Sequence, residues 1–124
     1  MASHIANDIV ARGGSALTLT DPATLTCAAN DYGWHEALAI QVRALSNAYR
    51  ILIAISSSGK SQNILSAVSV AKESGAKIVT FSGFSPNNPL RALGDCNYYV
   101  PSSNYGIVEI AHLAILHAIV NPGQ

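Results

Sequence analysis

A group of serines lies beside a glycine in the middle of the chain, directly after the apolar run 49–55. Serine hydroxyls, the backbone N–H groups around a glycine and the positive end of a following helix all donate to an anion. Open α/β sheets bind ligands at the carboxyl ends of their strands, so this position favours a binding role over a plain serine-rich turn. We predict a site for a phosphate monoester, made by Ser56, Ser57, Ser58 and Ser61.

The same segment has a second interpretation, because Gly59, Lys60 and Ser61 match the end of the nucleotide P-loop G-x-x-x-x-G-K-[ST]. The leading glycine of that motif would stand at position 54, which is Ala54 within the apolar run. The next apolar run, 77–82, does not end in the aspartate that would hold Mg²⁺. The sequence therefore disfavours a nucleotide triphosphatase.

Two pairs of ionisable residues have helical spacing near the two ends of the chain. His4 and Asp8 are four residues apart and share one helix face. Glu109 and His117 are eight apart, about 80° around a helix from each other and about 12 Å along its axis. Both pairs could line one cleft and act there as acids and bases. From spacing alone, solvated helix-face side chains are the simpler interpretation.

The elements that must position these residues alternate along the chain between strand-like and helix-like periodicity, with Gly and Pro between them. Apolar or β-branched runs predict four strands, over 15–20, 49–55, 77–82 and 97–100. Helical spacing and capping signals predict helices over 2–11, from Asp21 and Pro22 onward, and over 34–46, 62–74, 88–93 and 105–120. This alternation indicates an α/β fold with right-handed crossovers, a three-layer doubly wound parallel sheet.

The composition limits the possible partners. The chain has 124 residues, the size of a single domain, so 1–124 is expected to be one unit. Hydrophobic residues make up 49% of the chain, which excludes a disordered protein. The 7 basic residues balance the 7 acidic ones, so the composition lacks the excess of positive charge that is typical of nucleic-acid binding. No apolar run reaches the roughly 20 residues of a membrane span. With only 11% charged residues, we expect a homo-oligomer, a dimer or tetramer.

The chain start has no basic and apolar leader, which predicts a cytoplasmic location. Cys27 and Cys96 are 69 residues apart and fit neither a disulfide framework nor a C-x-x-C metal motif. They are predicted to be small buried thiols.

Two segments, LIAISSSGKSQNI at 52–64 and AKESGAKIVTFSG at 71–83, give the chain a family resemblance. The chain resembles the sugar isomerase (SIS) domain, and most closely its phosphoheptose isomerase branch; the likeness extends to 29–33 and 109–117. The resemblance implies a sheet of flavodoxin-type order and serines that hold the phosphate of a sugar phosphate. It also implies an isomerase that interconverts ketose and aldose phosphates through an enediol.

In that family a His-x-x-x-Glu pair, and a Gln with a His eight residues later, bind zinc. The resemblance therefore implies a Zn²⁺ site at His4, Asp8, Glu109 and His117, with Asp8, Glu109 and His117 also moving the proton. Asp8 replaces Glu and Glu109 replaces Gln, so the match is partial. His112 is a competing ligand that we interpret as a packing or interface residue. Asp31 resembles an acid of the family's substrate loop and is equally well explained as a turn residue.

Family members begin with helical residues, a central first strand and a Gly/Ser-rich turn before the helix that here starts at Met1. We therefore expect an N-terminally truncated chain that associates and has little or no isomerase activity. The alternative hypothesis is a non-catalytic phosphosugar-binding or assembly module that has lost the chemistry. The missing turn favours it, as do the substitutions at Asp8, Glu109 and Gly106, the last at a position where the family commonly has an Asp.

Overall fold

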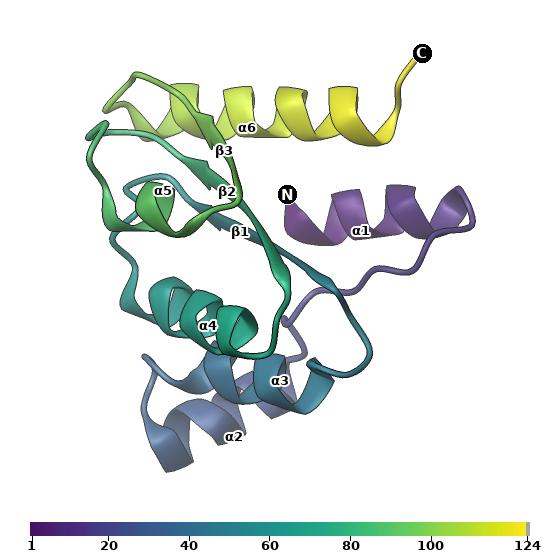
Figure 1. The fold of residues 1–124 in the computed structure, drawn as a ribbon, viewed down its shortest axis with the longest axis vertical. Helices are drawn as coiled ribbons and strands as arrows, with labels where there is room; N and C mark the ends of the chain where they lie inside the picture. The colour runs from purple at the N-terminus through teal and green to yellow at the C-terminus, as the bar shows by residue number, and fades with distance from the viewer. Residues whose placement is uncertain (124) are drawn as a thin grey trace.

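The fold is an α/β arrangement of helices around a small parallel sheet (Figure 1). The computed structural model describes residues 1–123. The helices are α1 (Ala2–Ala11), α2 (Pro22–Tyr32), α3 (Ala37–Leu45), α4 (Gln62–Glu73), α5 (Pro89–Leu93) and α6 (Tyr105–Val120). The strands are β1 (Ile51–Ser56), β2 (Lys77–Ser82) and β3 (Cys96–Tyr99). No helix within 1–123 is both long and apolar enough to cross a membrane.

The sheet is parallel throughout, with the strands in the order β1-β2-β3. Ser56 pairs with Ser82, and Ser82 with Tyr99, so all three strands end at the same edge. Helices α1 and α6 cover one face of the sheet, while α4, with α3 and α2 behind it, covers the other (Figure 1). The predicted three-layer, doubly wound architecture is confirmed.

Each face of the sheet has its own hydrophobic core, because successive strand residues point to opposite sides. Ile78 on β2 and Ala54 on β1 pack with α3, α4 and α5 on one side. Phe81, three residues after Ile78 on β2, points to the opposite face and packs there with Ile5 of α1 and Leu116 of α6. This second core fixes α1 and α6 side by side, which brings their polar residues together.

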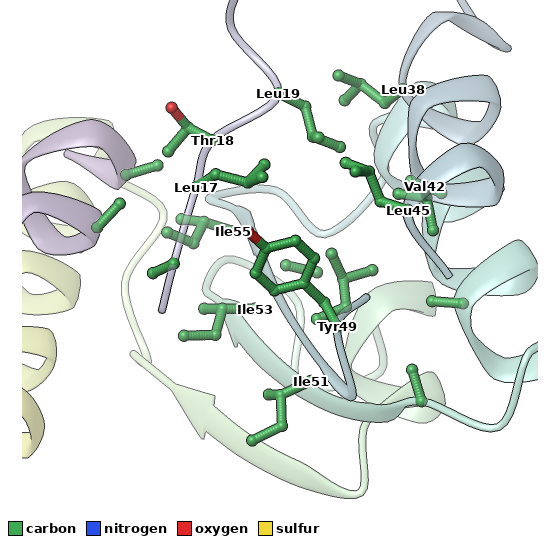
Figure 2. A pocket seen from close by; sticks show the side chains of 18 of the residues that line it. Leu17, Thr18, Leu19, Leu38, Val42, Leu45, Tyr49, Ile51, Ile53 and Ile55 are labelled. Atoms are coloured by element: carbon green, nitrogen blue, oxygen red, sulfur yellow. The ribbon is translucent and has the colours of Figure 1, made fainter. Parts of the chain in front are cut away.

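The predicted strand over 15–20 is wrong. This segment is unpaired, and it lies across a largely apolar cavity of about 500 Å³ from the free edge of β1 (Figure 2). Leu17 and Leu19 line one side of the cavity, and Ile51, Ile53 and Ile55 line the other. Composition gives 15–20 the character of a strand, but a strand also requires a neighbour within hydrogen-bonding distance, about 4.8 Å away.

The buried thiols are a second error, because both cysteines are exposed. Cys27 lies on α2, a helix whose main contact is with α3, and Cys96 begins the edge strand β3. Cys27 Sγ donates to the Asp31 carboxylate at 3.5 Å, and this hydrogen bond raises the pKa of the thiol. The other boundaries match those predicted within a few residues, the largest difference being that α3 begins at Ala37 rather than Trp34.

His112 is fully buried between α6 and the sheet, in agreement with its interpretation as a packing residue. Its Nε2 donates to the Ser82 carbonyl at 3.1 Å, and its Nδ1 has no hydrogen-bond partner among the described residues. Burial lowers the pKa of His112 below its usual 6.5, although the Ser82 carbonyl and the Glu109 carboxylate partly oppose the shift. Burial in the fold therefore favours the neutral form of this imidazole.

Acidification is expected to destabilise the chain through His112. Below about pH 6.5 the unfolded state binds a proton that the folded state resists, so the free energy of unfolding falls as the pH drops toward the lowered pKa. Urea unfolding of the unaltered chain and of His112→Gln, at several pH values across this range, measures the effect. The variant should show the smaller loss of stability on acidification. An equal loss in both proteins would contradict this role for His112.

Candidate phosphosugar and metal site

The serine loop, residues 56–61, joins the end of β1 to the start of α4. Gly59 has a φ of +65°, a left-handed conformation that glycine adopts without strain, and its N–H donates to the Ser56 carbonyl at 3.0 Å. The Lys60 N–H donates to Ser58 Oγ at 3.3 Å, and Ser56 Oγ lies 3.1 Å from Ser61 Oγ. The turn therefore gathers three of the four predicted serine hydroxyls through short-range contacts.

The helix that follows the loop leaves donors free. Ser61 is the N-cap of α4, yet its hydroxyl makes no capping hydrogen bond. Among residues 1–123, the backbone N–H groups of Gln62 and Asn63 have no acceptor. Uncapped N–H groups at a helix start bind anions, and the exposed ammonium of Lys60 adds a positive charge nearby.

A second polar group, the His–Asp cluster, consists of His4 and Asp8 on α1 and His117 on α6. Asp8 Oδ2 lies 3.8 Å from His4 Nε2 and 3.4 Å from His117 Nδ1. The two imidazole rings pack edge to face, with centroids 5.0 Å apart. The contact between α1 and α6 thus joins residues that are more than 100 positions apart in the sequence.

Asn121, which the sequence analysis did not single out, completes this cluster. Its Nδ2 donates to Asp8 Oδ2 at 3.3 Å and lies 3.1 Å from His117 Nδ1. Arg12 Nε donates to Asn121 Oδ1 at 2.7 Å, which orients the amide so that its NH₂ faces the cluster. Its spacing of four residues from His117 could have predicted a place on the same side of the helix. An Asn just after a helix, however, is also an ordinary signal for the end of that helix.

The cluster fits the metal that the family resemblance implies. One ligand atom from each of His4, Asp8 and His117 lies within 4.8 Å of the others. Bonds of about 2.0–2.1 Å in a tetrahedral site place ligand atoms about 3.3–3.4 Å apart, so a small contraction would close the group around an ion. The Asn121 NH₂ meanwhile presents its donors to the same two acceptor atoms that would bind a cation.

The other two predicted residues lie apart from the cluster. Glu109 is exposed in the second turn of α6, about 12 Å along the helix axis from His117. Asp31 lies in the last turn of α2, where Asn30 Nδ2 donates to its carboxylate at 3.0 Å. Within 1–123, no hydrogen bond or ion pair joins Asp31 to the serine loop or to the His–Asp cluster.

The serine loop and the His–Asp cluster lie toward opposite ends of the molecule. The loop is at the edge of the sheet where α6 begins, and His117 lies in the last turn of α6 (Figure 1). Twelve residues separate Tyr105 from His117, about 18 Å along the helix. One copy of the chain therefore presents two separate polar surfaces rather than one cleft.

Comparisons with known proteins identify relatives of this chain, although no family model matches it. The phosphoheptose isomerase of Helicobacter pylori (strain P12) is 37% identical over an alignment of 125 positions, which covers 95% of this chain and 65% of that protein. The phosphoheptose isomerase of Alkalilimnicola ehrlichii is 39% identical over an alignment of 127 positions, with the same coverage of both chains. The chain thus spans about 65% of the length of the curated relatives it matches.

Solved structures give the same result for the fold. A phosphoheptose isomerase from Neisseria gonorrhoeae superposes with a TM-score of 0.90 at 29% identity, covering 97% of this chain and 67% of that one. The protein from Francisella tularensis gives 0.89 at 33% identity, covering 97% and 66%. The chain belongs to the sugar isomerase (SIS) domain family. Within that family it is a homologue of the phosphoheptose isomerases.

Proposed function

We propose that this chain binds a sugar phosphate and forms part of an isomerase that interconverts ketose and aldose phosphates through an enediol. The serine loop is the observation that carries the proposal. It places hydroxyl groups, free helix N–H groups and Lys60 at the carboxyl end of a parallel strand, which is where α/β folds bind anionic ligands. The homology to phosphoheptose isomerases supports a sugar phosphate as the substrate class.

The proposed chemistry belongs to the His–Asp cluster. Aldose–ketose interconversion moves a proton between C1 and C2, which requires a base that accepts the proton and an acid that returns it. Asp8 is partly buried and lies 3.4 Å from His117 Nδ1, so the two side chains face one site; Asp8 is the proposed base that accepts the proton and His117 the proposed acid that returns it. His4, Asp8 and His117 would hold Zn²⁺, which supplies polarisation of the substrate carbonyl when bound. Glu109 stays a proposed member of this site.

In a homo-oligomer the serine loop and the His–Asp cluster could lie in one site, because a second copy could place its His–Asp cluster beside the serine loop of the first. The outer face of α6 supports association. Ile107 and Ile110 are 56% and 72% exposed, on a helix in which Glu109 is the one Asp, Glu, Lys or Arg residue. Helices that are apolar on every side are normally buried. We propose that this face packs against another copy of the chain.

The cavity beside β1 marks a place where a further strand could join the sheet. The family resemblance implies a central strand, and the segment 15–20 and the free edge of β1 face each other across the cavity (Figure 2). A strand placed there would also bring the turn that follows it to the carboxyl edge, near the serine loop. For residues 1–124 themselves we propose phosphate binding at the serine loop.

Ser58→Ala is expected to weaken binding of a ketose phosphate about tenfold. The Ser58 hydroxyl accepts the hydrogen bond from the Lys60 N–H, and in the proposed site it donates to the anion. Calorimetric titration of both proteins measures the affinities, and an isomerase assay on the same samples measures turnover. Ser69→Ala is the matched control, since Ser69 lies on the exposed side of α4 and contacts Glu73. Equal affinities for the unaltered chain and Ser58→Ala, or no binding by either, would contradict the proposed site.

A further inference from the structure

Asn88 lies at the centre of the sheet edge that carries the serine loop. Its side chain is 1% exposed and uses both ends of its amide. Nδ2 donates to Ser82 Oγ at 3.1 Å, to the Gly83 carbonyl at 3.2 Å and to the Ser85 carbonyl at 2.9 Å. Oδ1 accepts from the Arg91 N–H at 2.9 Å and so caps α5. One buried side chain thus ties the end of β2 to the loop and helix that follow.

The same side chain packs against the backbone of Gly59. A Cβ atom added at Gly59 would collide with the Asn88 amide, so the absence of a side chain at Gly59 is what permits the contact. Two backbone hydrogen bonds flank it: the Leu90 N–H donates to the Gly59 carbonyl at 3.1 Å, and the Gly83 N–H donates to the Ser57 carbonyl at 2.8 Å. The serine loop is therefore held from behind by residues 83–90.

We infer that Asn88 is a positioning residue for phosphate binding: it sets the place of Gly59 and thereby aims the donors of the serine loop at the anion. This inference rests on the proposed phosphate site. Backbone N–H groups bind an anion well when their direction is fixed before the ligand arrives, and a buried, fully hydrogen-bonded amide is a rigid support. The contacts that hold the loop come from residues that follow β2.

Asn88→Ser tests the inference with little disturbance of the fold. Serine is a good N-cap and can keep the bond to the Arg91 N–H, while the three Nδ2 contacts and the packing against Gly59 are lost. Titration with inorganic phosphate and with a ketose phosphate should show affinities about tenfold weaker than those of the unaltered chain, as expected for one misdirected charge-assisted hydrogen bond.

Asp21→Ala is the matched control for the loss of helix stability. Asp21 caps α2 by accepting from the Thr24 N–H at 2.8 Å, and α2 packs mainly on α3, away from the serine loop. This variant should lose stability and keep its phosphate affinity. An unchanged affinity in Asn88→Ser, or an equal loss in Asp21→Ala, would overturn the inference. If Ser58→Ala does not alter binding either, the proposed site has failed rather than the role of Asn88.

Hydrogen exchange on the unaltered chain provides a second test, which does not depend on whether a substituted protein folds. If residues 83–90 support the loop, saturating phosphate should slow exchange of the Leu90 and Gly83 N–H groups, whose acceptors are Gly59 and Ser57. Protection of these two amides supports the inference. Unchanged exchange at both amides, with phosphate bound, would overturn it.

Discussion

His117→Ala is expected to lower the affinity of the chain for Zn²⁺ by about 100-fold or more. The imidazole would supply one of three proposed ligand atoms, which already lie within 4.8 Å of one another, and the loss of residues that merely orient such ligands costs about 10–100-fold. The variant also removes the partner of Asp8 at 3.4 Å. Zinc titration against a competing chelator measures the change directly, independently of any catalytic activity.

His112→Ala is the control for this prediction, because His112 is buried against Ser82 and lies outside the cluster. Zinc retained in His117→Ala and lost in His112→Ala would reverse the assignment. Glu109→Ala tests the fourth proposed ligand. Within one copy Glu109 lies about 12 Å along the axis from His117, so a loss of zinc in this variant would indicate that Glu109 reaches the ion from a second copy.

Ile110→Lys is expected to convert an oligomeric chain into a monomer of 12.9 kDa. Ile110 is 72% exposed on the outer face of α6, so lysine is tolerated in a single copy but would bury a charge in a helix–helix interface. Light scattering coupled to size exclusion measures the mass of both proteins. The unaltered chain should give a multiple of the monomer mass.

Ile53→Lys distinguishes this interface from association through the open edge of β1. Ile53 is 39% exposed and lines the cavity beside that edge, where a charge opposes strand pairing. We expect this variant to remain associated. Dissociation of Ile53→Lys but not of Ile110→Lys would place the interface at β1, and a monomeric unaltered chain would contradict both.

The local parts of this fold were predictable from sequence. The bounds of β2 and α6 match the predicted 77–82 and 105–120, because an apolar β-branched run, an Asn cap and a Pro–Gly stop act within a few residues. The serine loop was predictable for the same reason. A buried strand, a glycine with positive φ and a helix start follow one another along the chain, so their geometry is largely set by neighbours in sequence.

Contacts between distant segments were decided only by the tertiary structure. The segment 15–20 has the composition of a strand, yet pairing depends on a neighbour that β1 does not supply across the cavity. The exposure of Cys27 likewise follows from how α2 packs, which its own sequence does not encode.

The serine loop and the His–Asp cluster also combine features that were predictable from sequence with features that only the tertiary structure showed. Sequence alone determined the fold class, the serine loop and the His4–Asp8 pair, since each depends on residues within a few positions of one another. The tertiary structure decided that Asn121 joins Asp8, that Asn88 supports Gly59, and that Glu109 lies apart from the His–Asp cluster. The physical reason is that these contacts arise from the packing of whole elements, α1 on α6 and the β2 edge on the serine loop. Packing depends on the summed burial of many side chains rather than on local spacing.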